Sequence, residues 1–480
     1  MASRDPRRAV LVTANSDIAS DRSAMSDIES RRAWRAFAVA SASIFLFVLD
    51  AGLLSVSLPE IAQTFPDASR ATISWVSTGY LVSVAGLLLV AGRLGDAFGR
   101  KRVFQTGMIV LFVGSLTSGL APSIGLLIVS RMVQGVGGAL VSATGLTLVL
   151  ADIPSHRRAL AVGVWGSVGS VAAILGPTLG AEIVDAAGWR FALASIAPIA
   201  LGSYIVGRRY LRESDVTTAP RRLDLPSVLL ATIGIGSIAL GLSQSRIWGW
   251  SDAKTLSAFA AGLLAFVAFL DRSRRQPNPL LGLHLLRSGG YTGPTFAASL
   301  QQLGFFSWFF STSFVLSEIW GWSVRETGQA ISVTFVFSAI TGWAGGKAGA
   351  RIGMFWPTVI GAVVAAAGPL YWVFSFQDDP SFWAVYLPGA ALFGLGGGAC
   401  GILTTGMALR SVSDEDQGMA YAAHQTARRM ASSFGLALMA TLLGEASGTD
   451  LLGGARNVWI MCAAVHLIMI VPLAVTSRGD

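Results

Sequence analysis

Long apolar stretches separated by short polar connections recur along almost the whole 480-residue chain. About 20 apolar residues span the hydrocarbon core of a bilayer as an α-helix. Because hydrocarbon offers no partner for an unpaired backbone group, such a chain folds as membrane-spanning helices. The stretches predict an all-α integral membrane protein with fourteen spans, at about residues 36–57, 72–92, 103–121, 124–150, 159–181, 189–207, 225–244, 255–270, 291–317, 327–346, 356–376, 382–409, 418–443 and 456–476.

Composition excludes several classes of protein. Of all residues 53% are hydrophobic and 13% are charged, whereas soluble domains carry roughly 25% charged residues. The net charge of +8 is spread over membrane connections and does not indicate a nucleic-acid partner. Cys400 and Cys462 fall inside apolar runs and have no disulfide or metal spacing. No P-loop motif is found, so we expect neither a metal nor a cofactor.

Most of the 35 Lys and Arg residues lie on alternate connections. Basic residues accumulate on the cytoplasmic side of membrane proteins. The pattern therefore predicts a multi-pass protein of the cell inner (plasma) membrane with both termini in the cytoplasm, which requires an even number of spans. Three arginines are expected inside the membrane: Arg131, Arg428 and Arg429.

Residues 1–33 are polar and rich in Ser and Arg, without an apolar core segment. They do not resemble a signal peptide, and we expect a disordered cytoplasmic tail. An alternative is that translation begins at Met25.

The connection between the second and third spans, GRLGDAFGRKR at residues 92–102, is short and highly charged. It resembles the signature loop of the major facilitator superfamily, G-x-L-x-D-x-x-G-R-K/R. The matching residues are Gly92, Leu94, Asp96, Gly99, Arg100 and Lys101. The glycines are expected to allow a sharp turn between closely packed helix ends. Asp96 is expected to pair with a basic residue or with a helix N-terminus.

A weaker copy of this loop, GWAGGKAGARI, occurs at residues 342–352. Its Gly349 aligns with Gly99 when the glycines of the two loops are matched. Two related halves are typical of transporters that bind substrate between them. We therefore expect two six-helix bundles, at 34–212 and 289–480, with an inserted helix pair and linkers at 213–288.

The first span contains Asp50 within FLFVLDAGLLSVSLPEI. A charged carboxylate inside a membrane is costly and usually functional. The stretch is similar to a motif of the fourteen-helix drug:proton antiporter branch, l-D-x-T-x-x-N-x-A-L-P, although Gly52 replaces the Thr and Ser55 the Asn. The resemblance implies that Asp50 couples transport to protons or contacts substrate. The alternative is an acid that only pairs with a neighbouring helix.

The fourth span carries Arg131, Gln134 and Gly135 in the order of the superfamily pattern R-x-x-Q-G-x-G. The resemblance implies that Arg131 assists proton transfer and that Gln134 borders the substrate cavity. Arg131 could instead be a structural hub that donates to backbone carbonyls.

The fifth span contains Gly176, Pro177 and Gly180, which resemble the antiporter motif G-x-x-x-G-P-x-x-G-G. Pro177 is expected to kink the helix, and the glycines to permit close packing. In the family this motif accompanies export, so it favours efflux over uptake. Simple helix packing is the alternative.

Polar side chains in the second half suggest the substrate cavity, namely Gln301, Gln302, Trp308, His424, Gln425 and Arg428. Gln425 and Arg428 share a helix face. His424 could titrate near neutral pH or be a hydrogen-bonded polar group. Gln301, Gln302 and Trp308 could instead be packing residues.

Taken with the resemblance, these patterns predict a non-enzymatic secondary transporter that exports lipophilic drugs or secondary metabolites in exchange for protons. Its partners are expected to be a small lipophilic substrate, protons and the lipid bilayer, and the protein is expected to be a monomer. The alternatives are an uptake or facilitated-diffusion carrier and a non-transporting membrane sensor.

Overall fold

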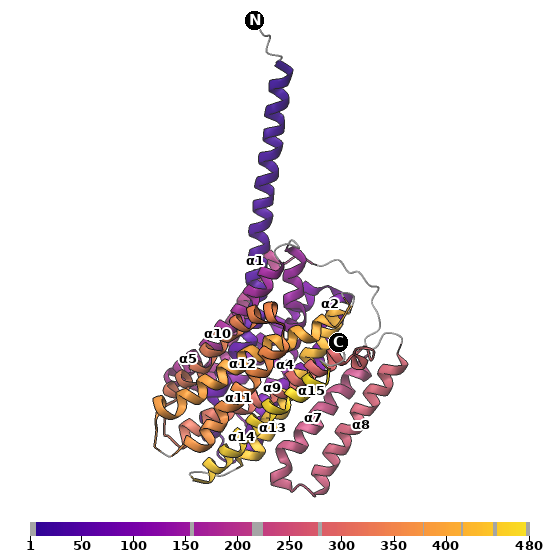
Figure 1. Ribbon diagram of the computed structural model, residues 1–480. Helices are drawn as coiled ribbons and strands as arrows, with labels where there is room; N and C mark the ends of the chain where they lie inside the picture. Colours follow the sequence, from indigo (N-terminus) through magenta and orange to yellow (C-terminus); the bar gives the residue numbers. More distant parts are fainter. Residues whose placement is uncertain are drawn as a thin grey trace.

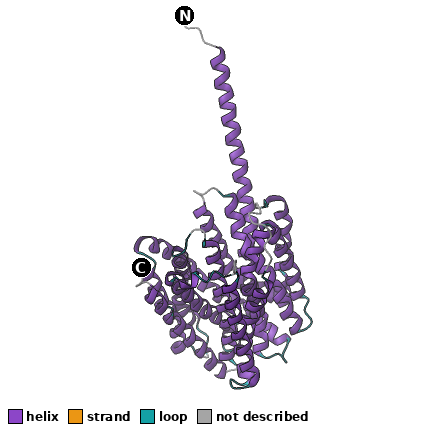
Figure 2. Cartoon of the chain, turned by 90° about the vertical axis from the view of Figure 1, so that its right-hand side faces the viewer, coloured by secondary structure: helices purple, strands orange, loops and turns teal. Residues whose placement is uncertain are grey.

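The computed structural model describes residues 6–153, 158–213, 224–276, 281–377, 379–413, 416–444 and 449–476. Throughout these residues it consists of helices and connecting loops, without a strand (Figure 2). The helices lie side by side in one bundle, and the N-terminal part of α1 projects from it (Figure 1).

The helices are α1 (Pro6–Thr64), α2 (Arg70–Phe98), α3 (Arg100–Gly119), α4 (Ile124–Asp152), α5 (Arg158–Ala194), α6 (Ile196–Tyr210), α7 (Leu225–Trp248), α8 (Ala253–Arg275), α9 (Gly289–Glu318), α10 (Val324–Ile352), α11 (Phe355–Ser375), α12 (Leu387–Arg410), α13 (Gln417–Leu443), α14 (Thr449–Ile468) and α15 (Ile470–Thr476). A short 3-10 helix, Leu285–Arg287, precedes α9, and a π-helical turn, Phe382–Tyr386, precedes α12.

Helices α1 to α14 follow the fourteen predicted spans in order, and α15 completes the last span. By length and hydropathy alone, nine stretches of the described chain qualify to cross a membrane; they lie in α1, α2, α4, α5, α7, α8, α11, α12 and α14–α15. The other long helices carry more polar residues, such as the arginine pair of α13.

The fifth span is longer than predicted, and the sixth begins at the predicted residue. Helical structure continues from α5 through Gly188, where the backbone turns with φ 81°, and a second break follows at Ser195 before α6. The sixth span therefore begins at Trp189 within α5. The eighth span is longer than expected, because α8 covers 23 residues.

The predicted disordered tail also differs from the structure, in which α1 begins at Pro6. The stretch between Pro6 and Gly52 contains neither proline nor glycine, the two residues that most disfavour a helix interior. The helix therefore continues beyond the bundle without a break (Figure 1).

The two signature loops occupy equivalent places, but the predicted alignment is wrong by one helical turn. Gly99 ends α2 with φ 96°, and the residue that ends α10 in the same way is Gly353, with φ 83°. Only glycine adopts such backbone angles without strain. Gly349 instead corresponds to Gly95, since a Cβ on Gly349 would meet α12 and a Cβ on Gly95 would meet α4.

Helices α7 and α8 form a hairpin at one side of the bundle (Figure 1). Helix α7 packs against α2 and α13. The Trp75 Nε1 of α2 donates to Ser243 Oγ of α7 over 3.1 Å, and Thr441 of α13 donates to the Leu242 carbonyl over 2.6 Å. Helix α8 lies outside α7 and exposes large apolar side chains such as Leu264, as contact with lipid requires.

Candidate functional site

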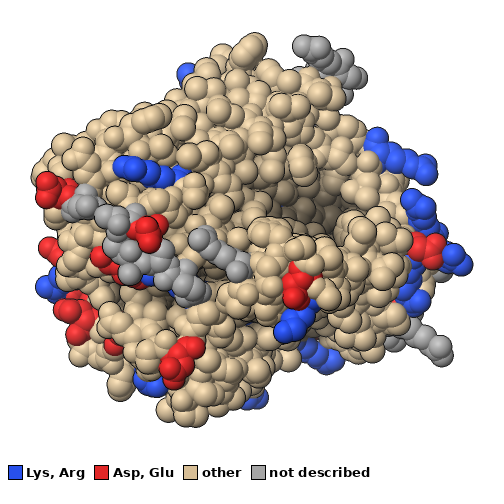
Figure 3. Space-filling model, turned by 90° about the horizontal axis from the view of Figure 1, so that it is seen from below, with Lys and Arg blue, Asp and Glu red and all other residues tan. Residues whose placement is uncertain are grey.

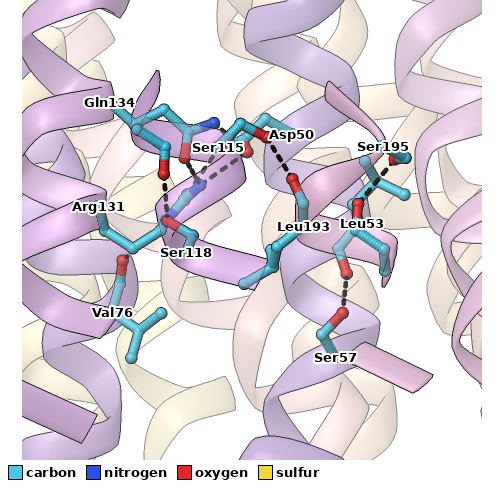
Figure 4. Close-up of polar contacts among 12 residues, drawn as sticks. Asp50, Leu53, Ser57, Val76, Ser115, Ser118, Arg131, Gln134, Leu193 and Ser195 are labelled. Atoms are coloured by element: carbon cyan, nitrogen blue, oxygen red, sulfur yellow. Dashed lines mark hydrogen bonds and ion pairs between the residues drawn. The ribbon is translucent and has the colours of Figure 1, made fainter. Parts of the chain in front are cut away.

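Asp50, Arg131 and Gln134 form one buried polar cluster between α1 and α4 (Figure 4). Arg131 donates from its two terminal nitrogens to the two carboxylate oxygens of Asp50, each over 2.7 Å. Arg131 also donates to Gln134 Oε1 over 2.6 Å, and Gln134 donates to Asp50 over 3.0 Å. The exposed fractions of these residues are 2%, 1% and 0%. Bidentate charge-assisted pairs of this kind are among the strongest hydrogen-bonded contacts.

The same guanidinium reaches α2. Its Nε donates to the Val76 carbonyl over 3.2 Å, and its Cζ lies 4.8 Å from the ring centre of Tyr80. Arg131 therefore joins three helices, because it pairs with Asp50 of α1 and donates to a backbone carbonyl of α2, as the structural alternative for its motif expects. Any change in the charge of Asp50 acts directly on a contact among three helices.

Helix α1 crosses α5 immediately beside Asp50. A Cβ on Gly52 would lie 2.6 Å from the backbone of Gly176, and a Cβ on Gly180 would lie 2.9 Å from Leu53. No larger residue fits at Gly52 without moving α5. This contact gives a steric reason for the departure from the antiporter motif at Gly52, and it places the glycines of the fifth span at a helix crossing.

The opposite side of α5 contacts α10. Ser332 of α10 donates to the Ile174 carbonyl over 2.8 Å and lies 2.7 Å from the Thr178 hydroxyl. A Cβ on Gly328 would lie 2.4 Å from the Pro177 carbonyl. Pro177 thus lies between α1 and α10, on a helix that touches both halves of the chain.

Two ion pairs join the halves at the end of the bundle opposite the projecting part of α1. Arg70 of α2 donates to Glu318 of α9 over 2.5 Å, and Arg325 of α10 pairs with Glu182 of α5. Figure 3 views this face, which is hollowed on one side and carries charged side chains mainly around its edge.

In the signature loop Asp96 pairs with Arg100, one turn later, over 3.0 Å. The N-terminus of α3 instead binds Glu213, whose carboxylate accepts from the Lys101 amide over 2.9 Å. Gly99 makes the turn between the helices. A Cβ on Gly92 would meet open space, so this glycine is not needed for packing here.

Gln302, Gln425 and Arg428 also meet, as the sequence suggests. Arg428 donates to Gln425 Oε1 over 3.0 Å and to Gln302 Oε1 of α9 over 2.9 Å. Each amide oxygen accepts from a different terminal nitrogen. The guanidinium is therefore held in one orientation without a carboxylate.

The other predicted cavity residues lie elsewhere. The ring nitrogens of His424 lie 3.0 Å from Thr295 and 3.1 Å from Thr405, so His424 is a hydrogen-bonded link among α9, α12 and α13. Gln301 donates to the Gly397 carbonyl of α12. Trp308, seven residues later on the same face of α9, is fully buried against Phe393 of α12 and Trp372 of α11.

Sequence reasoning did not identify the aromatic residues beside these clusters. The guanidinium Cζ of Arg429 lies 3.8 Å from the ring centre of Phe47, and the Phe47 and Tyr80 rings are 5.9 Å apart. Phe47 is one of many apolar residues in its span, so nothing in the sequence distinguishes it. Tyr80 carries the only signal, a hydroxyl within an apolar run.

The sequence profile described as Major Facilitator Superfamily matches residues 40–270. The tetracenomycin C resistance and export protein of Streptomyces glaucescens is 28% identical over 87% of this chain and 77% of its own length. The cephamycin export protein of Amycolatopsis lactamdurans is 31% identical over 86% of this chain and 85% of its own. A crystal structure of a D-xylose-proton symporter superposes with a TM-score of 0.66 at 14% identity, covering 92% of this chain and 97% of the other.

Proposed function

Because the chain belongs to the major facilitator superfamily, we propose that it exports small lipophilic compounds across the plasma membrane in exchange for protons. The relatives named above are export and resistance proteins, and compounds of their kind are the first substrates to test. The observation that carries the proton coupling is the buried pair of Asp50 and Arg131.

The proposed architecture has two six-helix bundles, α1–α6 and α9–α15, which rock about the substrate, with α7 and α8 inserted between them. The contacts of α7 with α2 and α13 support an insert that packs on both bundles. Both termini are cytoplasmic in this proposal, so the Arg70–Glu318 pair lies on the outer side. The transporter acts as a monomer and binds no nucleic acid.

Protonation of Asp50 is the coupling step. A neutral carboxylic acid no longer attracts Arg131 as an ion, and one of its oxygens becomes a donor. Arg131 then keeps its bonds to Gln134 and the Val76 carbonyl, and the link between α1 and α4 is weakened. Proton entry can drive substrate export through one transporter if the proton and the substrate each bind the inward-facing and outward-facing states with unequal affinity.

The test is accumulation in energised inverted membrane vesicles, with tetracenomycin C and a cephamycin as labelled probes. We expect accumulation of at least one probe, which a protonophore abolishes. Accumulation only in right-side-out vesicles would identify an uptake carrier. Absence of transport in both orientations would contradict the proposal and favour a sensor.

A further inference from the structure

Helix α13 places two adjacent guanidinium groups inside the bundle without a carboxylate. Arg428 and Arg429 make no ion pair within the described part of the chain, whereas Arg131 is paired with Asp50. Both side chains are partly exposed, although His424 and Ser432, about one turn away on either side, are buried. At this level α13 therefore leaves part of both arginine side chains uncovered by the rest of the protein.

The orientation of Arg428 leaves donors available. Its terminal nitrogens donate to Gln302 and Gln425, but its Nε has no acceptor in the described structure. Two neutral amides fix the guanidinium and leave its charge uncompensated. A charge that is partly withdrawn from water is stabilised by a paired ion, so an anion that arrives here is bound favourably.

Arg429 is held by an aromatic ring. Its Cζ lies 3.8 Å from the Phe47 ring centre, and none of its nitrogens has a hydrogen-bond acceptor among the described residues. The next ring, Tyr80, faces Arg131, whose carboxylate partner Asp50 is already bound through both oxygens. The positive charge of Arg429 therefore remains without an anion.

We propose that Arg428 and Arg429 bind a carboxylate of the exported compound, with the apolar body of that compound against Phe47. This inference rests on the proposed function, because it names the substrate class of that transporter. Guanidinium groups bind carboxylates with good geometry. Arg428 has an Nε without an acceptor in the described structure, and the adjacent Arg429 lies against Phe47. A lipophilic acid is therefore the preferred substrate, rather than an amine.

The test is calorimetric binding of 2-naphthoate and of its uncharged analogue 2-naphthamide to the purified full-length protein. We expect the wild type to bind the acid at least tenfold more tightly than the amide. Arg429→Gln is expected to lose at least tenfold in affinity for the acid and less than twofold for the amide. Arg428→Gln is expected to cause a similar but smaller loss of affinity for the acid, since it also releases the amides of Gln302 and Gln425 from their hydrogen bonds.

Two further variants keep the test decisive. Arg429→Lys keeps the charge and is expected to retain a preference for the acid, which separates recognition from misfolding. Arg410→Gln, the same substitution at an exposed end of α12, is the matched control and is expected to bind as the wild type does. A wild type without preference for the acid, or an Arg429→Gln protein that loses acid and amide equally, would show that Arg429 only joins α13 to α1 and Arg428 only joins α13 to α9.

Because this binding measurement needs no proton gradient, its failure can be told apart from failure of the proposed function. A protein that accumulates a probe in energised vesicles but binds the acid and the amide equally remains an exporter with another substrate class. A protein that prefers the acid but drives no export would support the proposed binding site and contradict the proposed transport function.

Discussion

Two hydrogen bonds of 2.7 Å join the guanidinium of Arg131 to the carboxylate of Asp50, one from each terminal nitrogen. The pair joins α4 to α1 at a place where both side chains are almost completely buried. Both charges are thereby compensated inside the membrane. The same arrangement makes the contact sensitive to one proton, because protonation of Asp50 removes its charge.

Arg131→Lys should therefore weaken transport although it keeps the positive charge. Lysine is a point charge and cannot form the two-bond fork. It also loses the bond from Nε to the Val76 carbonyl. We expect a fall of at least about tenfold in the rate of proton-driven export, equivalent to about 1.4 kcal/mol, measured in inverted vesicles at equal protein content. Arg410→Lys is the control, and an unchanged rate in Arg131→Lys would contradict a role for the fork.

The contact between α5 and α10 predicts that a cross-link stops the cycle. The hydroxyls of Thr178 and Ser332 lie 2.7 Å apart, so Thr178→Cys combined with Ser332→Cys should form a disulfide. The background replaces Cys400 and Cys462 by Ala. We expect oxidation to abolish export and a reductant to restore it, because α5 and α10 then cannot part. Each single-cysteine variant should be insensitive to oxidant; full activity of the oxidised double variant would show that this contact need not open.

Helices α7 and α8 should be dispensable for the transport site. Ser237→Ala and Ser243→Ala are each expected to change export less than about twofold, or about 0.4 kcal/mol. Ser243→Ala removes the partner of the Trp75 indole and should lower thermal stability more than Ser237→Ala does. Vesicle transport with several substrates measures the first effect, and a thermal shift measures the second. A marked change in substrate selectivity would place the insert at the cavity.

Much of the fold could be predicted from the sequence, because apolar length and charged connections are local signals. The superfamily and the exporter class predicted from the motifs are confirmed by the relatives. The roles of Asp50 and Arg131 remain predictions, although the structure brings the two residues together. Spacing alone did not show whether Asp50 pairs with Arg131 or faces water, since the two lie 81 positions apart.

Other features depend on tertiary packing and have no local signal. The turn glycine of the second loop was misassigned because several glycines lie within two turns, and only the backbone angle of Gly353 identifies it. The contact of Glu213 with the Lys101 amide joins segments 112 positions apart. Arg429 was recognisable as a polar residue in a membrane span, but its position over Phe47 follows from how α13 meets α1.

The most direct test of the central claim is the transport behaviour of Asp50→Asn in proteoliposomes, with a probe that the wild type accumulates. Asn keeps the size and hydrogen-bonding capacity of Asp but cannot bind or release a proton. We predict that the variant folds, inserts and exchanges labelled for unlabelled probe, while accumulation driven by a proton gradient is abolished. Proton-driven accumulation in Asp50→Asn at the wild-type rate, with the wild-type dependence on pH, would remove Asp50 from the mechanism.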